Sequence, residues 1–212
     1  MDLEKFGDKI QRELSLRKME LSRFSILFQE GTERPHLDLL CRAAIVLSYA
    51  HWEGFVKSGS AFYVKHINGR QLPVGSLKYP LQAAYVTSRF KQAADSSKTT
   101  FLGDVLGLID SDRKAIFSAK PEKCFDTESN LSSSVFKALV LGLGLDYLSE
   151  YETRNAFMDE KLVHGRNKVA HGELVQFDRQ DAEERLDAVR YLMDHYSDQL
   201  LDAARDEAYL AS

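Results

Sequence analysis

Apolar residues recur at three- and four-residue steps over most of the chain, and this spacing predicts amphipathic α-helices. It predicts a first helix over residues 2–30, with Asp2 as its N-cap. Gly31 and the Glu-Arg-Pro that follows it predict the end of this helix. The apolar positions expected to face the core are Leu3, Phe6, Ile10, Leu14, Leu21, Phe24 and Phe28.

The second predicted helix covers residues 36–67 and is apolar almost all round in its first half, which predicts the central helix of a bundle. Trp52 belongs to this core, and His51 lies on a different side from the polar stripe that runs along the helix. That stripe, at seven- and four-residue steps, consists of Arg42, Tyr49, Glu53 and Lys57. A buried charge needs a partner, so Arg42 and Glu53 either lie at a solvent-facing edge, pair with each other through neighbours or have a functional role.

The rest of the chain predicts further helices joined by loops. We expect a loop over residues 68–76 and a third helix over 78–94, whose buried side is Leu81, Ala84, Tyr85 and Phe90. Residues 95–130 give only a polar linker, one or two short helices and a loop. Later helices are predicted over residues 131–143 (capped by Asn130 or Ser132), over 154–171, and from Asp178 to near the C-terminus. The last helix has a heptad-like apolar seam: Leu186, Val189, Met193, Tyr196, Leu200 and Ala203.

These elements predict an all-α fold, a multi-helix up-and-down bundle that forms a single domain over residues 1–212. With 44% hydrophobic and 28% charged residues, the composition is that of an ordinary globular protein. The two cysteines do not form a disulfide framework, so we expect a reducing, cytoplasmic environment. The charged, amphipathic N-terminal stretch is not expected to act as a signal peptide, and no apolar run is long enough to cross a membrane.

The most distinctive stretch is residues 162–173, LVHGRNKVAHGE, which ends the helix predicted over residues 154–171. On an ideal α-helix, four hydrogen-bonding side chains fall on one face, and Arg166 falls on the opposite, apolar side. A glycine directly after His171 predicts that this histidine lies in the last turn of the helix. The four side chains of the polar face are Glu160, His164, Asn167 and His171.

The charge pattern limits where a polyanion could bind. A net charge of −4 gives no general affinity for nucleic acid, which requires local neutralisation of phosphates. Lys161, Arg166 and Lys168 form one local basic patch, whereas the outer face of the last helix is acidic. Any RNA should therefore approach from the side of residues 161–168. The histidines lack partners at zinc-site spacing, so we expect no metal site and no cofactor.

Residues 166–171 have the form R-N-x-x-x-H, and in this helical context the sequence resembles the HEPN superfamily. Residues 42–57 (RAAIVLSYAHWEGFVK) and 126–146 are similar to its prokaryotic RiboL-PSP-HEPN branch and the related MAE type. The resemblance extends from about residue 36 to the end of the chain. It implies a metal-independent endoribonuclease, often a toxin or antiphage-defence effector, which dimerises so that two motifs share one cleft. A partner antitoxin or regulatory protein is also implied.

The resemblance assigns Arg166 and His171 as the catalytic pair and Asn167 as the polar residue that follows the arginine. The chemistry suits them, because an imidazole moves protons and a guanidinium stabilises a phosphorane when a 2′-OH attacks the adjacent phosphate. We further expect Glu53 to pair with Arg166. His164 and Glu160 are expected to support the site, and Lys161 and Lys168 to bind RNA. The alternatives are a catalytically silent HEPN module that binds RNA or a protein, and a structural dimerisation domain.

Overall fold

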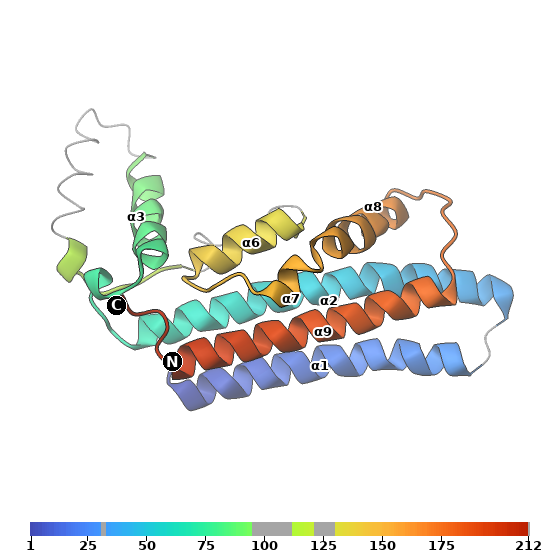
Figure 1. Cartoon of the computed structure of the whole chain (residues 1–212), viewed down its shortest axis with the longest axis horizontal. Coiled ribbons are helices and arrows are strands. Elements are labelled where there is room, and N and C mark those ends of the chain that lie inside the picture. The colour runs from blue at the N-terminus through green and yellow to red at the C-terminus, as the bar shows by residue number, and fades with distance from the viewer. Residues whose placement is uncertain (31–32, 95–111, 121–129, 212) are drawn as a thin grey trace.

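The computed structural model describes residues 1–30, 33–94, 112–120 and 130–211. Three long helices lie side by side and form the body of the molecule: α1 (Leu3–Gln29), α2 (Arg34–Gly69) and α9 (Arg179–Arg205) (Figure 1). The described residues contain no β-strand, which confirms the predicted all-α fold. Among them, no helix combines the length and the apolar character that a membrane span needs.

Local sequence signals set where these helices begin. The side chains of Asp2 and Asp178 accept hydrogen bonds from backbone N–H groups three residues on, at 2.8 and 2.7 Å. Ser132 caps α6 (Ser133–Gly142) in the same way, by accepting from the N–H of Val135 at 3.3 Å. Each such cap stabilises a helix by about 1 kcal/mol. Of the two caps predicted for this helix, Ser132 is therefore correct and Asn130 is wrong.

The core is centred on α2, as predicted. Trp52 is fully buried, and its ring meets that of Phe136 at 4.9 Å between centroids. Phe136 in turn meets Tyr196 of α9 at 5.4 Å, and the Tyr196 hydroxyl shares a 2.7 Å hydrogen bond with Ser60 of α2. The seam predicted along α9 is buried at every position. Most apolar positions predicted for α1 are buried as well, although Leu3 is exposed.

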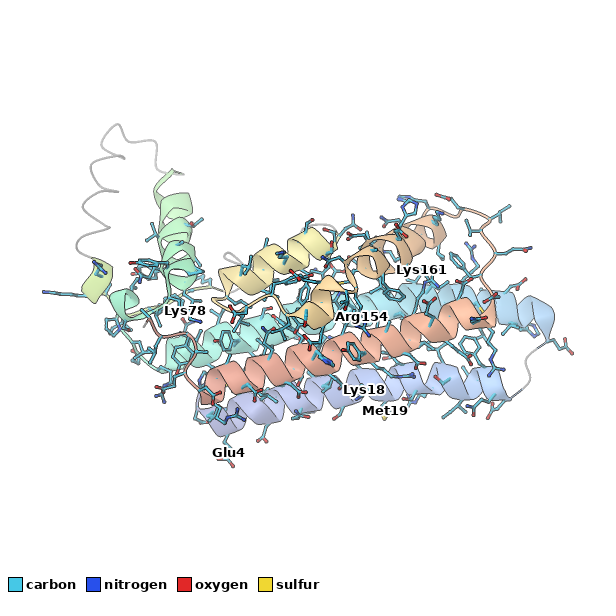
Figure 2. The ribbon with its side chains drawn as sticks, in the orientation of Figure 1. Glu4, Lys18, Met19, Lys78, Arg154 and Lys161 are labelled. Atoms are coloured by element: carbon cyan, nitrogen blue, oxygen red, sulfur yellow. The ribbon has the colours of Figure 1, made fainter. Side chains whose placement is uncertain are left out.

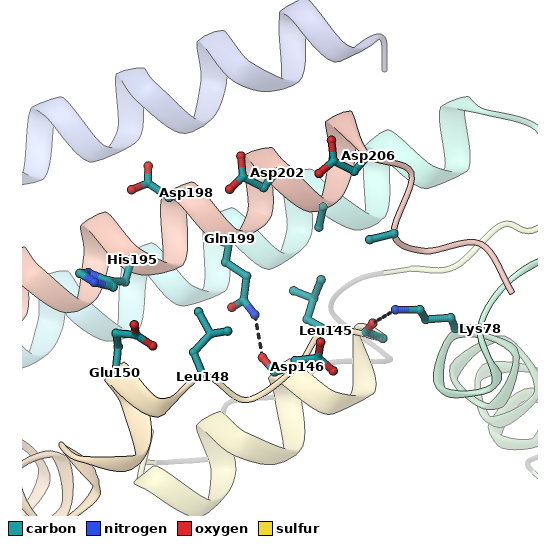
Figure 3. Close-up of a pocket in the computed structure, with 13 residues that line it drawn as sticks. Lys78, Leu145, Asp146, Leu148, Glu150, His195, Asp198, Gln199, Asp202 and Asp206 are labelled. Atoms are coloured by element: carbon teal, nitrogen blue, oxygen red, sulfur yellow. Dashed lines mark hydrogen bonds between the residues drawn. The ribbon is translucent and has the colours of Figure 1, made fainter. Parts of the chain in front are cut away.

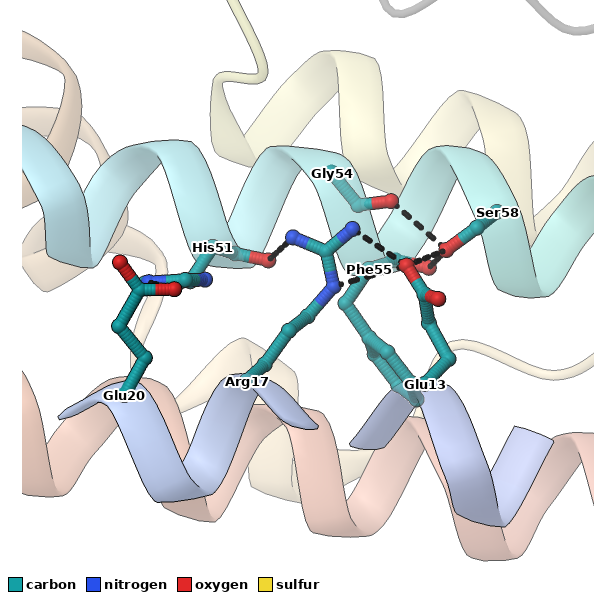
Figure 4. A network of polar contacts seen from close by, with 7 residues as sticks. All are labelled: Glu13, Arg17, Glu20, His51, Gly54, Phe55 and Ser58. Atoms are coloured by element: carbon teal, nitrogen blue, oxygen red, sulfur yellow. Dashed lines mark hydrogen bonds and ion pairs between the residues drawn. The ribbon is translucent and has the colours of Figure 1, made fainter. Parts of the chain in front are cut away.

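Polar contacts also join α1 to α2 (Figure 4). Arg17 donates to the backbone carbonyl of His51 at 3.3 Å and pairs with Glu13 of its own helix. Glu13 accepts a 3.1 Å hydrogen bond from the hydroxyl of Ser58. The buried ring of His51 lies 3.6 Å from the carboxylate of Glu20. His51 therefore faces α1, on a different side of α2 from the polar stripe, as predicted.

The shorter elements form a second layer along one side of the long helices (Figure 1). It consists of α6, α7 (Ser149–Glu152), η3 (Phe157–His164) and α8 (Gly165–Ala170). The structure places α3 (Tyr79–Ala94), η1 (Val74–Ser76) and η2 (Asp112–Lys114) at one end of the molecule. Leu81 and Tyr85 of α3 are buried as predicted, whereas the side chain of Phe90 lies outside the described residues. The sequence did not predict α7, which is a single turn.

The helix predicted over residues 154–171 is not one α-helix. The segment η3 is π-helical and passes directly into α8. In a π-helix each N–H bonds to the carbonyl five residues back, so the chain turns less per residue than an α-helix does. The 100° spacing of an ideal α-helix, which the prediction assumed for residues 160–164, therefore does not hold in this segment.

Two side chains fix η3 in place. The carboxylate of Asp159 accepts hydrogen bonds from the N–H and hydroxyl of Ser133, at 2.7 and 2.6 Å, and so binds the N-terminus of α6. Arg185 of α9 is only 3% exposed and donates from Nε to the carbonyl of Lys161 at 3.1 Å. These contacts attach the segment that leads into α8 to both neighbouring elements.

Candidate active site

His171 stands at the C-terminus of α8, as the sequence predicted. It is the C-cap residue and is exposed. Gly172 follows with φ of +74°, a left-handed conformation that glycine adopts without strain. The N–H of Gly172 bonds to the carbonyl of Val169 at 3.1 Å, and that of Glu173 to the carbonyl of Lys168 at 3.0 Å. This Schellman motif ends the helix directly after His171 and leaves the imidazole in solvent.

Arg166, one and a half turns earlier, faces the interior of the molecule. Its Nη2 donates to the side-chain carbonyl of Asn130 at 2.6 Å. Its Cζ lies 4.3 Å from the centroid of the Tyr49 ring, a cation–π contact. The Tyr49 hydroxyl accepts a 2.7 Å hydrogen bond from the N–H of Leu131. Thus α2, the segment before α6, and α8 converge on one guanidinium.

This geometry corrects the expected partner of Arg166. The guanidinium does meet the polar stripe of α2, but at Tyr49, one turn before Glu53. The carboxylate of Glu53 forms an ion pair with Lys57 of the same helix at 3.0 Å. The predicted Glu53–Arg166 pair is not among the ion pairs within the described residues. A helical wheel can give the stripe that faces α8, but the turn at which contact occurs depends on how the helices are offset.

Arg42, at the start of the stripe, holds the loop that follows the motif. Its Nη1 donates to the backbone carbonyls of Glu173 at 2.9 Å and Val175 at 3.0 Å. Beside this contact is a cavity of about 410 Å³, lined by Asp38, Arg42, Leu174, Val175, Gln176 and Phe177. The expectation that Arg42 pairs with Glu53 through neighbours is therefore not met, since the partners of Arg42 are main-chain carbonyls of this loop and Glu53 pairs with Lys57.

The predicted polar face is open to solvent. Glu160, His164 and His171 are exposed, and Asn167 is half-buried. Within the part of the chain that the structure describes, no hydrogen bond or ion pair engages the side chains of His164, Asn167 or His171. These groups are therefore available to a ligand. No cluster of three or more His, Cys, Asp and Glu side chains among the described residues is arranged to hold a metal ion.

The basic patch is smaller than the sequence indicated. The ammonium of Lys161, which Figure 2 labels, lies 3.6 Å from the carboxylate of Asp181 and 3.9 Å from that of Glu184, both on α9. These acidic residues offset its charge, so Lys161 is a weaker candidate for binding phosphate. Lys168 is half-buried and lies within α8 itself. It remains, with Arg166, the basic residue closest to His171 in the chain.

A second hollow, of about 360 Å³, lies along the C-terminal half of α9 (Figure 3). The amide of Gln199 donates to the carbonyl of Asp146 at 2.6 Å, and Lys78 donates to that of Gly144 at 3.0 Å. Its acidic lining residues are Asp146, Glu150, Asp198, Asp202 and Asp206. Their negative charge disfavours phosphate, so this hollow is a poor site for RNA, in agreement with the expectation that the outer face of the last helix repels it.

An all-α fold in which an R-N-x-x-x-H motif ends a short helix, with its histidine exposed, is consistent with a HEPN module. The family model described as RiboL-PSP-HEPN matches residues 12–202, and the protein belongs to this family. The match begins inside α1, so the relationship covers more of the chain than the stretch from residue 36 that the sequence motifs indicated. Comparison with curated proteins and with solved structures gives no match.

Three residues of this site were not recognised from the sequence. Asn130 was considered only as a helix cap, Tyr49 only as part of a stripe, and Arg185 not at all. A buried arginine on an otherwise apolar helix face is a usable signal for Arg185, since such a charge needs partners. For Asn130 no local signal exists, because its partner lies 36 residues away.

Proposed function

We propose that this protein is an endoribonuclease that cleaves RNA without a metal ion, by attack of a 2′-OH on the adjacent phosphate. His171 moves the protons and Arg166 stabilises the charge of the phosphorane. The products are a 2′,3′-cyclic phosphate and a 5′-hydroxyl. The observation that carries the proposal is that one short helix presents both the anchored guanidinium of Arg166 and, at its C-terminus, the exposed imidazole of His171. Membership of a family whose modules are often ribonucleases supports it.

The active form that we propose is a homodimer. A single motif supplies one imidazole, whereas cleavage benefits from a base and an acid on opposite sides of the phosphate. A twofold axis beside the exposed polar face brings a second His171 to the same cleft. Leu174, three residues beyond His171, is 98% exposed, and an apolar side chain in this position suits burial against a partner subunit.

RNA is expected on the side of α8, where Arg166 and Lys168 from two subunits combine into one positive groove. The acidic hollow along α9 favours this side by repelling the polyanion elsewhere. Glu160, His164 and Asn167 line the approach to His171. In the cell we assign the protein to the cytoplasm as a toxin or antiphage-defence effector, restrained by an antitoxin or other regulatory protein.

The test is cleavage of end-labelled RNA by the purified protein in excess chelator, with analysis of the product ends. We expect activity to survive chelation and to be lost in Arg166→Ala and His171→Ala. Arg12→Ala and His195→Ala, which change an arginine and a histidine outside α8, serve as matched controls and should cleave normally. Cleavage that persists in His171→Ala, or that stops on chelation, would contradict the proposed mechanism.

One observation favours a second candidate, a catalytically silent HEPN module that binds RNA or a partner protein. Arg166 is engaged by Asn130 and Tyr49, as a purely structural arginine would be. In that case the protein binds RNA, or a partner co-purifies with it, but no cyclic phosphate forms at any protein concentration. A structural dimerisation domain would instead form dimers with no affinity for RNA.

A further inference from the structure

Among the described residues, two groups of different kinds contact the guanidinium of Arg166. The side-chain carbonyl of Asn130 accepts from Nη2 in the plane of the guanidinium, at 2.6 Å. The Cζ of Arg166 lies over the Tyr49 ring, 4.3 Å from the ring centroid. One contact holds the Nη2 end of the guanidinium and the other holds its centre. Together they define an orientation, which a single ion pair does not.

The two holding groups are also fixed to each other. The Tyr49 hydroxyl accepts the N–H of Leu131, the residue after Asn130, at 2.7 Å. Tyr49 is 2% exposed and Leu131 is fully buried, so water does not compete for this bond. The hydrogen bond between Tyr49 and Leu131 therefore fixes the backbone next to Asn130 against α2 and so places the Asn130 carbonyl beside the guanidinium. This arrangement is present before any ligand binds.

We propose that Asn130 is a positioning residue of the site, which together with Tyr49 orients the guanidinium of Arg166 towards the scissile phosphate. This inference rests on the proposed ribonuclease function and assigns a role to a residue outside the motif. The group that Asn130 presents to the guanidinium is an amide carbonyl, and the group that Tyr49 presents is an aromatic ring. Both attract a cation without adding negative charge, whereas a carboxylate at Asn130 would compete with the phosphate for the same guanidinium.

Two substitutions at this position separate positioning from mere packing. Asn130→Ala removes the acceptor and should lower kcat about tenfold to hundredfold, the range that follows from a hydrogen bond to a charged group. KM should change little, because Lys168 and the exposed face still bind RNA. Asn130→Asp keeps an acceptor of the same shape, so it should keep or raise the melting temperature and still lose activity. A purely structural asparagine predicts the opposite, a folded and fully active Asn130→Asp variant.

Chemical rescue provides a second test. If Asn130 and Tyr49 form a niche for a guanidinium, millimolar guanidinium ion should restore part of the activity of Arg166→Ala. It should not restore the double variant Arg166→Ala/Asn130→Ala. Ser132→Ala, which removes the N-cap of α6 two residues away, is the matched control: it should lower stability and leave both kcat and rescue unchanged. Equal rescue of the single and double variants would overturn the proposal.

A measurement independent of cleavage separates this inference from the proposed function. In ¹⁵N-arginine NMR spectra, an oriented Arg166 side chain should rotate slowly about its Nε–Cζ bond, and Asn130→Ala should make this rotation fast. An Arg166 signal that is the same in both proteins refutes positioning by Asn130. Absence of cleavage by the wild-type protein, or cleavage that does not need His171, refutes the ribonuclease proposal and leaves the NMR result to decide the role of Asn130.

Discussion

Replacing Arg42 by methionine tests whether the loop after the motif is held from α2. The substitution keeps most of the side-chain volume but removes both hydrogen bonds from Nη1, to the carbonyls of Glu173 and Val175. A hydrogen bond to a charged group contributes about 1.5–3 kcal/mol when buried. The bond to Glu173 is exposed and that to Val175 only partly buried, so water replaces much of each. We therefore expect a total loss of about 1–3 kcal/mol in the free energy of unfolding.

The assay combines denaturant unfolding with amide hydrogen exchange. Exchange should accelerate between residues 171 and 178, while the core of α2 and α9 keeps its relative protection. Cleavage should fall as well, because the loop fixes the end of the helix that carries His171. Arg12 is an exposed arginine of α1, so Arg12→Met is the matched control and should leave stability, hydrogen exchange in this loop and cleavage unchanged. An Arg42→Met protein with wild-type stability and wild-type exchange in this loop would refute the reasoning.

Three further predictions concern other parts of the molecule. Burial lowers the pKa of His51 and of His66 below 6.5, so the unfolded chain binds more protons than the folded protein near this pH. Stability should therefore fall as pH drops through about 6.5. Denaturant midpoints at pH 7.5 and 5.5 measure this loss, and the double variant His51→Gln/His66→Gln should reduce it. Gly172→Ala should cost about 1–2 kcal/mol, because the alanine must adopt φ of +74°; an unchanged melting curve would contradict it. Leu174→Asp should give well-folded, inactive monomers in sedimentation, and an active dimer would exclude Leu174 from the interface.

The parts of the fold that local sequence determines were predictable. Asp2 and Asp178 cap their helices because a carboxylate directly before a helix accepts hydrogen bonds from the free backbone N–H groups of the first turn. The α9 seam follows from the apolar periodicity, and the end of α8 at His171 follows from the glycine that comes directly after this histidine. These signals act over a few residues, so tertiary packing does not need to be known to interpret them.

The contacts of the site were less predictable because they join distant segments. Tyr49, Asn130 and Arg166 come from three elements, and nothing in any one stretch indicates that they meet. The π-helical turns of η3 also have no periodic signature, yet they alter which residues share a face. Lys161 illustrates how contacts between distant segments change a prediction. The sequence indicated a free positive charge, but α9 places the carboxylates of Asp181 and Glu184 within 4 Å of its ammonium group.

The different burial of the two motif residues bears on how a complete site is formed. Five residues of α-helix turn the chain by about 140° beyond a full turn, so Arg166 and His171 leave α8 in different directions. Arg166 accordingly reaches α2, and His171 faces solvent at the C-cap. In the proposed mechanism the phosphate contacts both residues at the C-terminal end of α8, and the exposed Leu174 follows three residues after His171 in the chain. One subunit leaves this region open, whereas a second subunit packed on Leu174 would close it and bring another imidazole to the phosphate. The dimer that we propose thus accounts for the exposed leucine, the solvent-facing histidine and the need for two proton-transfer groups by one arrangement.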